Sequence, residues 1–207
     1  MKKILEVCVD SLASALAAAE GGADRLELCS ALVVGGLSPD VALFRQIRAQ
    51  CSLPVRCLMR PRAGDFLYTS WEIDLLCAQI EALKAAGADG FVIGALTPEG
   101  QLDRSAMQRL LSACDGKPVT LYRCIDVSRD LAETYRTAAE LGVDTVLTSG
   151  GAANCVEGAA RLEELLRRPR VDYASLAPFD PGRPALPADI QDRVETEIKY
   201  AGYIKRQ

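Results

Sequence analysis

The chain has 207 residues, 49% of them hydrophobic and 25% charged, which is the composition of an ordinary globular domain that can bury a substantial core. Its formal net charge of -4 and its scattered Lys and Arg argue against a nucleic-acid surface, because such surfaces are usually basic stripes. No apolar run approaches the roughly 20 residues that span a bilayer, and residues 1–10 become acidic before a signal-peptide core could form. We therefore expect a cytoplasmic protein with small-molecule or protein partners, no nucleic acid and no membrane.

The chain contains no histidine, which removes the commonest general base and the commonest metal ligand together. Any chemistry must then use Asp, Glu, Cys, Lys, Arg or Tyr. Eight cysteines are dispersed along the chain without a CxxC pair, so a disulfide framework or a zinc cluster is not expected. Most of these cysteines should be reduced and buried.

Short apolar runs alternate with amphipathic stretches, which is the pattern of βα units around a parallel sheet. The expected strands are residues 4–9, 25–29, 55–60, 90–96, 119–125 and 145–149. The expected helices are residues 11–20, 39–50, 70–86, 103–114, 129–141 and 156–167. Ser38 before Pro39 predicts a helix N-cap, and Thr69 with Glu72 predicts a capping box.

These six units average about 28 residues each, which is the pitch of a (β/α)₈ barrel of about 250 residues, so two units are missing. A doubly wound open sheet is the alternative, but the segment after the first strand lacks a Gly-rich phosphate fingerprint. The sequence favours an α/β fold of TIM-barrel lineage, truncated to about six βα units.

A compositional change near residue 167 marks a domain boundary. Five of the ten prolines fall between residues 169 and 187, and a charged helical pattern follows at residues 189–207. We expect a barrel domain over residues 1–167, and a Pro-rich linker with a C-terminal helix over residues 168–207.

Six segments together resemble the CutC copper-homeostasis family over about residues 1–166. They are EVCVDS (6–11), GGADRLELC (21–29), GGLSP (35–39), RPRAGDFLYT (60–69), GADGFVIGAL (87–96) and VLTSGG (146–151). The resemblance implies a cytosolic TIM-barrel protein that serves copper homeostasis, binds Cu(I) and forms homodimers or larger oligomers. The copper cysteines proposed for that family fall on Cys8 and Cys29.

The chain departs from the family pattern in two places. On the fifth strand it reads LYRCID, so Tyr122 replaces a family histidine while Arg123 and Asp126 remain. The last two βα units of the family are replaced by residues 164–207, which resemble the C-terminal region of the MnmG (GidA) family of tRNA uridine-modifying enzymes. The dinucleotide-binding region of MnmG is missing, so neither FAD nor NAD is expected.

Cys8 and Cys29 stand at the ends of the first two expected strands. Neighbouring parallel strands lie about 4.8 Å apart, so two thiolates there can converge on one ion, and soft sulfur ligands select Cu(I). The alternative is that both cysteines are small hydrophobic core residues.

Charged residues in or just after the strands form a second candidate site. Arg60, Arg62 and Asp65 are candidates for binding a small anionic, phosphorylated ligand, and Glu27, Arg123 and Asp126 are the catalytic candidates, with Glu27 or Asp126 as base. This is the enzyme alternative. These charges could instead neutralise one another. The loop at 147–151 could offer backbone N-H groups to a phosphate or be a simple turn.

Six parallel strands cannot close an eight-stranded barrel and leave two unpaired edges. The residues after 167 or a second copy of the chain must cover them, so we expect at least a homodimer. A fusion product or scaffold without native activity is the remaining alternative.

Overall fold

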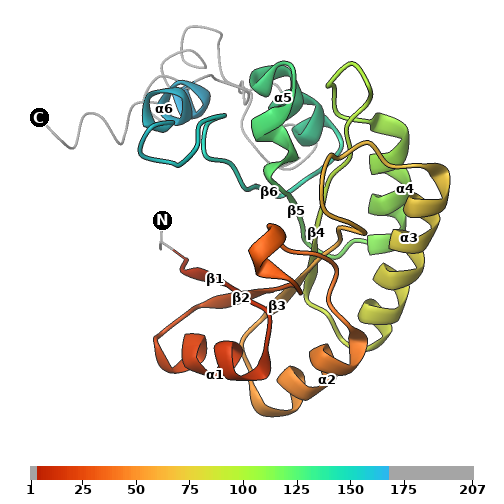
Figure 1. Ribbon diagram of the computed structural model, residues 1–207, viewed down its shortest axis with the longest axis vertical. Helices are drawn as coiled ribbons and strands as arrows, with labels where there is room; N and C mark the ends of the chain where they lie inside the picture. The colour runs from red at the N-terminus through yellow and green to blue at the C-terminus, as the bar shows by residue number, and fades with distance from the viewer. Residues whose placement is uncertain (1–3, 168–207) are drawn as a thin grey trace, which may run out of the picture.

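The structure, a computed structural model, describes residues 4–167. Its sheet contains β1 (Glu6–Val9), β2 (Arg25–Leu28), β3 (Val55–Leu58), β4 (Gly90–Ile93), β5 (Val119–Leu121) and β6 (Thr145–Val146). The helices are α1 (Leu12–Glu20), α2 (Val41–Gln50), α3 (Ser70–Ala85), α4 (Arg104–Cys114), α5 (Leu131–Glu140) and α6 (Ala159–Arg167), with 3-10 turns η1 (Leu32–Val34) and η2 (Arg123–Val127). Figure 1 shows strands and helices alternating along the whole described chain.

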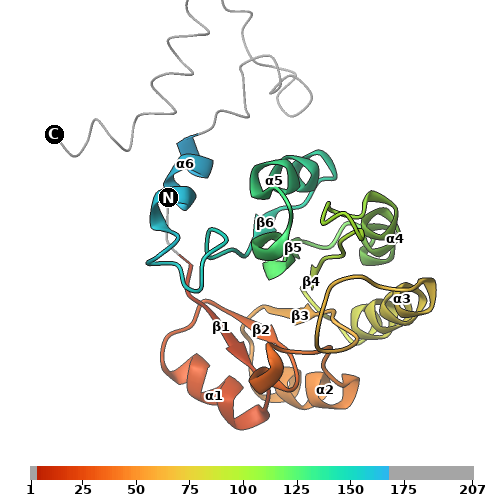
Figure 2. The ribbon, with the colours of Figure 1, turned by 45° about the horizontal axis from the view of Figure 1, so that its top comes forward.

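All strand pairs are parallel, and the spatial order is β1-β2-β3-β4-β5-β6. Figure 2 shows the helices around the outside of a curved sheet, with β1 and β6 at its two ends. Within residues 4–167, β1 pairs only with β2 and β6 only with β5. The predicted six βα units are therefore confirmed as a curled, open half-barrel.

The hydrophobic core lies between the sheet and its helices. Side chains alternate between the two faces of a strand, so every second residue points outward to the helices. The outward, buried residues include Leu26, Leu28, Cys57, Met59, Phe91, Ile93, Val119 and Leu121. They belong to the same core cluster as helix residues such as Phe44, Ile47, Leu76, Ile80, Leu83 and Met107. This packing holds the strands in place, and the other face of the sheet is turned away from the helices.

Two local predictions have different outcomes. The capping box of Thr69 and Glu72 at the start of α3 is confirmed. The predicted cap at Ser38 is wrong, because Asp40 caps α2 through the backbone N-H of Ala42. The Ser38 hydroxyl instead donates to the backbone carbonyl of Arg60 at 3.1 Å and accepts from its N-H at 3.0 Å, which ties this loop to the end of β3.

All six strands are shorter than predicted, the fifth by four residues. Residues 123–127 form η2, so β5 ends at Leu121. The predicted linker and terminal helix at residues 168–207 lie outside the described residues. Among the helices of residues 4–167, none combines the length and apolar character needed to cross a membrane.

Candidate functional site

The inner face of the sheet, which is the face turned away from the helices, carries an uninterrupted row of register partners. Cys8 lies opposite Glu27, Glu27 opposite Arg56, and Arg56 opposite Gly90. In a sheet these partners lie directly beside one another, so a thiol, a carboxylate and a guanidinium stand side by side across three strands. The alternation of charged and apolar residues in β1 to β3 produces this row.

Cys8 and Cys29 lie diagonally across β1 and β2. Cys29 follows β2 directly, and its thiol contacts the Val9 carbonyl oxygen of β1 at 3.5 Å. Cys8 is exposed and Cys29 is buried. Within the described residues, no group of three or more cysteine or carboxylate side chains is arranged to hold a metal, so the pair offers two sulfur ligands and no third.

Both thiols are held in their protonated form at neutral pH. The partly enclosed position of the Cys8 thiol, followed by the negative charges of Glu27 and Glu6, raises its pKa to about 12. Burial, followed by the charges of Cys8 and Glu27, raises the pKa of Cys29 to about 12. Cys8 is thus among the groups that raise the pKa of the Cys29 thiol.

Glu27 is the buried carboxylate of the inner face, with 5% of its surface exposed. Burial, followed by the nearby charge of Glu6, raises its pKa to about 7, although an interaction with the Cys8 thiol partly offsets the increase. Its Oε2 atom is buried and accepts no hydrogen bond from residues 4–167. This side chain can therefore take up or release a proton near neutral pH.

Arg56, the register partner of Glu27, turns away from it across the inner face. Its Nη1 donates to the hydroxyls of Thr120 and of Thr145, the latter at 3.3 Å. A Cβ atom at Gly90 would lie 3.2 Å from the Arg56 Cγ, so glycine leaves room for this crossing. Burial, followed by the like charge of Arg25, lowers the pKa of Arg56.

The guanidinium of Arg60, a predicted ligand-binding residue, is hydrogen bonded to the backbone of neighbouring loops. It donates to the backbone carbonyls of Val34 at 3.0 Å, Gly36 at 3.2 Å and Gly64 at 2.9 Å. Its guanidinium carbon also lies 5.1 Å from the centre of the Phe66 ring. The side chain is 8% exposed, and only its buried Nε lacks a partner among the described residues. Arg60 therefore fastens the loops after β2 and β3.

Arg62 and Asp65, the other two predicted ligand-binding residues, pair with each other at 2.8 Å. Arg62 also donates to Glu72 at 2.6 Å and lies over the Tyr68 ring at 5.5 Å. Asp65 accepts the backbone N-H of Leu67. Most of the charge on this predicted anion site is thus neutralised internally.

Asp126 accepts hydrogen bonds on both oxygens. Its donors are the Thr148 hydroxyl at 2.5 Å, the Ser149 N-H at 3.1 Å, the Gly151 N-H at 3.0 Å and the Arg123 Nε at 2.8 Å. Although burial alone raises its pKa, these hydrogen bonds outweigh burial and hold the pKa below its usual range. Asp126 thus occupies backbone N-H groups of the loop after β6 that the sequence suggested for a phosphate.

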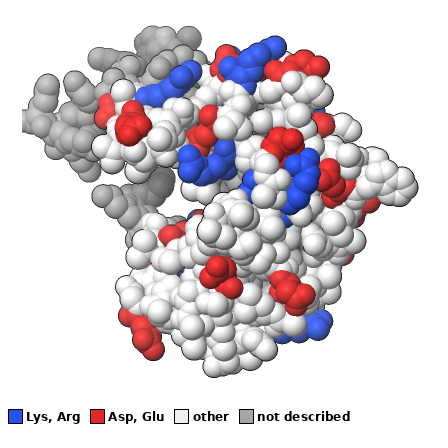
Figure 3. Space-filling model, viewed as in Figure 1, with Lys and Arg blue, Asp and Glu red and all other residues white. Residues whose placement is uncertain are grey.

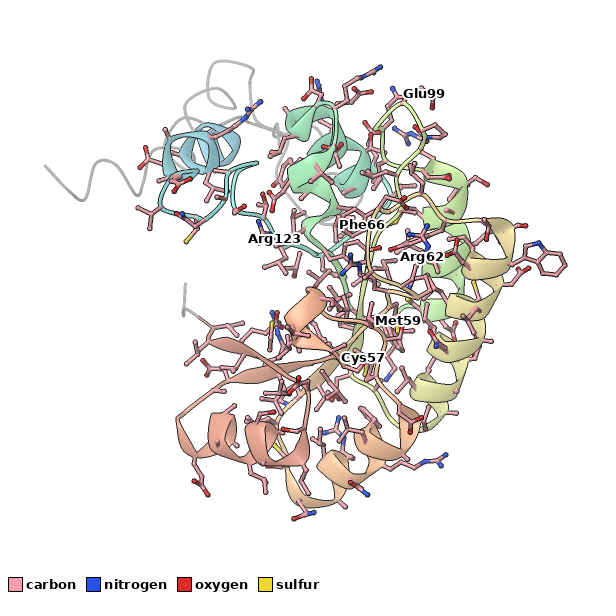
Figure 4. All side chains as sticks on the ribbon, viewed as in Figure 1. Cys57, Met59, Arg62, Phe66, Glu99 and Arg123 are labelled. Atoms are coloured by element: carbon pink, nitrogen blue, oxygen red, sulfur yellow. The ribbon has the colours of Figure 1, made fainter. Side chains whose placement is uncertain are left out.

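Arg123 is 52% exposed and belongs to the same cluster, because it also donates to the Ser149 hydroxyl at 2.8 Å. Figure 4 shows Phe66 between Arg62 and Arg123 in this view. Figure 3 shows Lys and Arg interspersed with Asp and Glu on one face, without a single-sign patch there.

Tyr122, which stands in place of a family histidine, has a buried hydroxyl at the end of β5. It donates to the Gly94 carbonyl at 2.6 Å and lies 2.8 Å from the Tyr68 hydroxyl. Its ring centre is 5.2 Å from that of Phe66. Burial raises the pKa of Tyr122 well above its ordinary value, so this residue is a neutral hydrogen-bonding group.

The structure thus brings Cys8, Cys29 and Glu27 together and keeps Arg60, Arg62 and Asp126 in separate local networks. The prediction from sequence missed Arg56. The sequence did contain a signal for Arg56. It is a charged residue in the apolar strand segment VRCLM, on the same strand face as Leu58, just as Glu6 and Glu27 are charged residues in their own apolar strands.

Comparison with known proteins identifies a family. A model of the CutC family matches residues 3–174. The chain is 46% identical over 167 residues to a CutC family protein of Agrobacterium fabrum, covering 79% of this chain and 66% of the relative. It is 41% identical over 165 residues to the human protein named "Copper homeostasis protein cutC homolog", covering 80% of this chain and 60% of the relative. The chain therefore spans about two thirds or less of the length of these two relatives.

Solved structures agree on the fold. A CutC crystal structure from Streptococcus agalactiae matches with a TM-score of 0.74 at 25% identity, covering 79% of this chain and 82% of that chain. Phosphonopyruvate hydrolase matches with a TM-score of 0.57 at 12% identity, covering 86% and 72%, a similarity that concerns the fold alone. These matches support the truncated TIM-barrel architecture.

Proposed function

Because this chain belongs to the CutC family, we propose that it is a copper homeostasis protein that binds Cu(I) through the thiolates of Cys8 and Cys29. The placement of these two cysteines on neighbouring strands of the inner sheet face carries the proposal. Sulfur ligands favour Cu(I) over the harder cations that prefer oxygen. Copper is the cargo of the protein in this proposal.

The two thiols are protonated before copper binds, and this affects the binding reaction. A metal ion binds the thiolate, so Cu(I) must displace the proton of each cysteine. Because both pKa values are about 12, the two protons leave only when the metal takes their place. Glu27, beside Cys8 on the next strand, is placed to receive a proton that leaves that thiol.

The test is a competition for Cu(I) between the full chain and a chromogenic chelator under anaerobic conditions. We expect one Cu(I) per chain and a large loss of affinity in the Cys8→Ala/Cys29→Ala variant. Cys155→Ala and Cys51→Ala are the matched controls, because the first thiol is exposed like Cys8 and the second is buried like Cys29. Equal affinity in the double variant and the parent would refute the assignment.

A second candidate function is an enzyme that acts on a small anionic metabolite, with Glu27 as the general base. The Oε2 atom of Glu27 is buried and has no hydrogen-bond partner within residues 4–167, and the pKa of Glu27 is about 7. Both observations favour Glu27 over Asp126, whose oxygens are already hydrogen bonded. Screening phosphorylated metabolites for ligand-dependent thermal shifts tests this function. The enzyme function is supported if a metabolite still produces a thermal shift in Glu27→Gln but is no longer turned over by that variant. It is contradicted if no metabolite produces a thermal shift.

We also propose that the protein acts in the cytoplasm, as its family resemblance implies. We propose further that it forms a homodimer or larger oligomer, because within residues 4–167 the outer edges of β1 and β6 have no strand partner. The resemblance of residues 164–207 to the MnmG C-terminal region stays a prediction. A variant that ends at residue 167 would test whether this segment contributes to assembly or copper binding.

A further inference from the structure

A pocket of about 570 Å³ opens at the amino end of the strands, and it is separate from the loops that hold Arg60, Arg62 and Asp126. Its walls are the apolar Ile4, Pro54 and Pro118 and four charged residues, Arg25, Arg56, Asp24 and Asp89. A pocket with apolar walls and a few convergent polar groups is the usual form of a small-molecule site. What the pocket can hold therefore depends on which of these charged groups are already paired.

Arg56 carries a buried guanidinium on which the charges of Glu6, Asp144 and Glu27 act. It is 8% exposed and forms no ion pair within residues 4–167. Its hydrogen bonds to neutral Thr120 and Thr145 both come from Nη1, which leaves Nε and Nη2 without a partner in the described part of the chain. A buried charge is costly unless an opposite charge and hydrogen bonds satisfy it.

The carboxylates around the pocket are committed to other groups. Asp89 pairs with Arg48 and accepts the Val55 N-H at 2.8 Å, and Glu6 pairs with Arg25. Asp24, also in the pocket wall, accepts the Leu5 N-H at 2.9 Å. Glu27, the register partner of Arg56, lies on the side of Cys8 instead. Asp144, a further carboxylate whose charge acts on Arg56, accepts the Val119 N-H at 2.6 Å. The guanidinium of Arg56, which forms no ion pair within residues 4–167, is thus the positive group that an added anion would satisfy.

We propose that this pocket binds a small oxyanion, a carboxylate or a phosphate, through Nε and Nη2 of Arg56. A guanidinium presents two parallel N-H groups that match the two oxygens of such an anion. The apolar walls leave room for a short carbon skeleton attached to it. Arg25, which is paired with Glu6, adds positive potential beside Arg56.

Isothermal titration of the full chain with inorganic phosphate and, separately, with acetate tests this site at constant ionic strength, with chloride as the balancing salt. We expect one anion per chain and an affinity that falls about tenfold or more in Arg56→Met, because a charge-assisted pair is lost. Arg56→Lys should bind with intermediate affinity, since it keeps the charge and loses the fork. Arg109→Met is the control, because Arg109 is exposed and pairs with Asp74 on the outer helices.

The two arms distinguish the class of anion: tighter phosphate binding indicates a phosphorylated ligand, and tighter acetate binding a carboxylate. If Arg56→Met does not fold, Pro54→Glu is a second variant that tests the same pocket. The new carboxylate in the pocket wall should raise the melting temperature and abolish anion binding. No saturable binding by either anion, or equal binding by the parent and Arg56→Met, would overturn the proposal, and it would leave the copper assignment untouched.

Discussion

Glu27 and Arg56 face each other in register on β2 and β3, yet their side chains do not form an ion pair with each other. Glu27 lies toward Cys8, and Arg56 crosses the inner face to Thr120 and Thr145. An ion pair would have neutralised both groups. Their separation leaves a carboxylate with a pKa of about 7 beside the cysteines, and beside the pocket a guanidinium that forms no ion pair within residues 4–167.

Glu27 should make the protein less stable as the pH rises. Its folded-state pKa of about 7 lies above the ordinary value of 4.5, so the folded state binds more protons than the unfolded state between these values. The free energy of unfolding should therefore fall between about pH 4.5 and pH 7, by up to about 3 kcal/mol. Urea unfolding from pH 4 to 8 checks this. Glu27→Gln should remove the decline, and an unchanged slope in that variant would contradict the assignment.

The Asp126 carboxylate should stabilise the loop after β6. Asp126→Asn replaces an acceptor oxygen by a donor that faces N-H and O-H donors of Arg123, Thr148 and Ser149, so we expect a loss of about 2–3 kcal/mol at pH 7. Because the folded-state pKa is depressed, this contribution is complete above the unfolded value of about 3.9 and disappears as the pH falls through the folded value. Urea unfolding at pH 7 and near pH 3 measures the difference. The exposed Asp65→Asn is the control, and an equal loss there would count against a special role for Asp126.

The Tyr122 hydroxyl should matter more for stability than that of Tyr68. Tyr122→Phe leaves the Gly94 carbonyl and the Tyr68 hydroxyl without this partner, which should cost about 1–3 kcal/mol. Tyr68→Phe should cost less, because Tyr122 keeps its bond to Gly94. Chemical denaturation of both variants provides the comparison. The reverse order would show that the network is organised around Tyr68.

Cu(I) affinity should rise steeply with pH. Both cysteine pKa values are about 12, so the protons that binding displaces make the apparent affinity rise by up to about 100-fold for each pH unit near neutrality. Chelator competition between pH 6 and 8 measures this slope. A single-cysteine variant, Cys8→Ser, should show about half the logarithmic slope, and a pH-independent affinity in the parent would exclude a two-thiolate site.

The open edges of the sheet should promote self-association. Ile4 and Leu5, which precede β1, are 59% and 53% exposed, and Leu147 after β6 is 37% exposed. Unpaired strand edges with apolar neighbours favour association, so light scattering at tens of micromolar should give at least the mass of a dimer. Leu5→Lys should shift the equilibrium toward the monomer, whereas Trp71→Lys on the outer helix α3 should not. A monomeric parent would refute this prediction.

The sequence by itself determined the six βα units and the order of the strands, because alternating apolar periodicity and short connections are local features. It also placed Cys8 and Cys29 on neighbouring strands, since consecutive βα units lie next to one another in a parallel sheet. Boundary errors arose where side chains formed unexpected local contacts, as when Asp40 rather than Ser38 capped α2.

Only the tertiary structure decided which charges are available for chemistry. Arg60, Arg62 and Asp126 look equally available in the sequence, but backbone groups and neighbouring side chains of the folded loops satisfy them. Arg56 looks like an ordinary strand residue, and its hydrogen bond to Thr145 spans 89 residues of sequence. Such pairings depend on both the strand register and the curvature of the sheet. The hydrophobic pattern of a single strand carries no information about either.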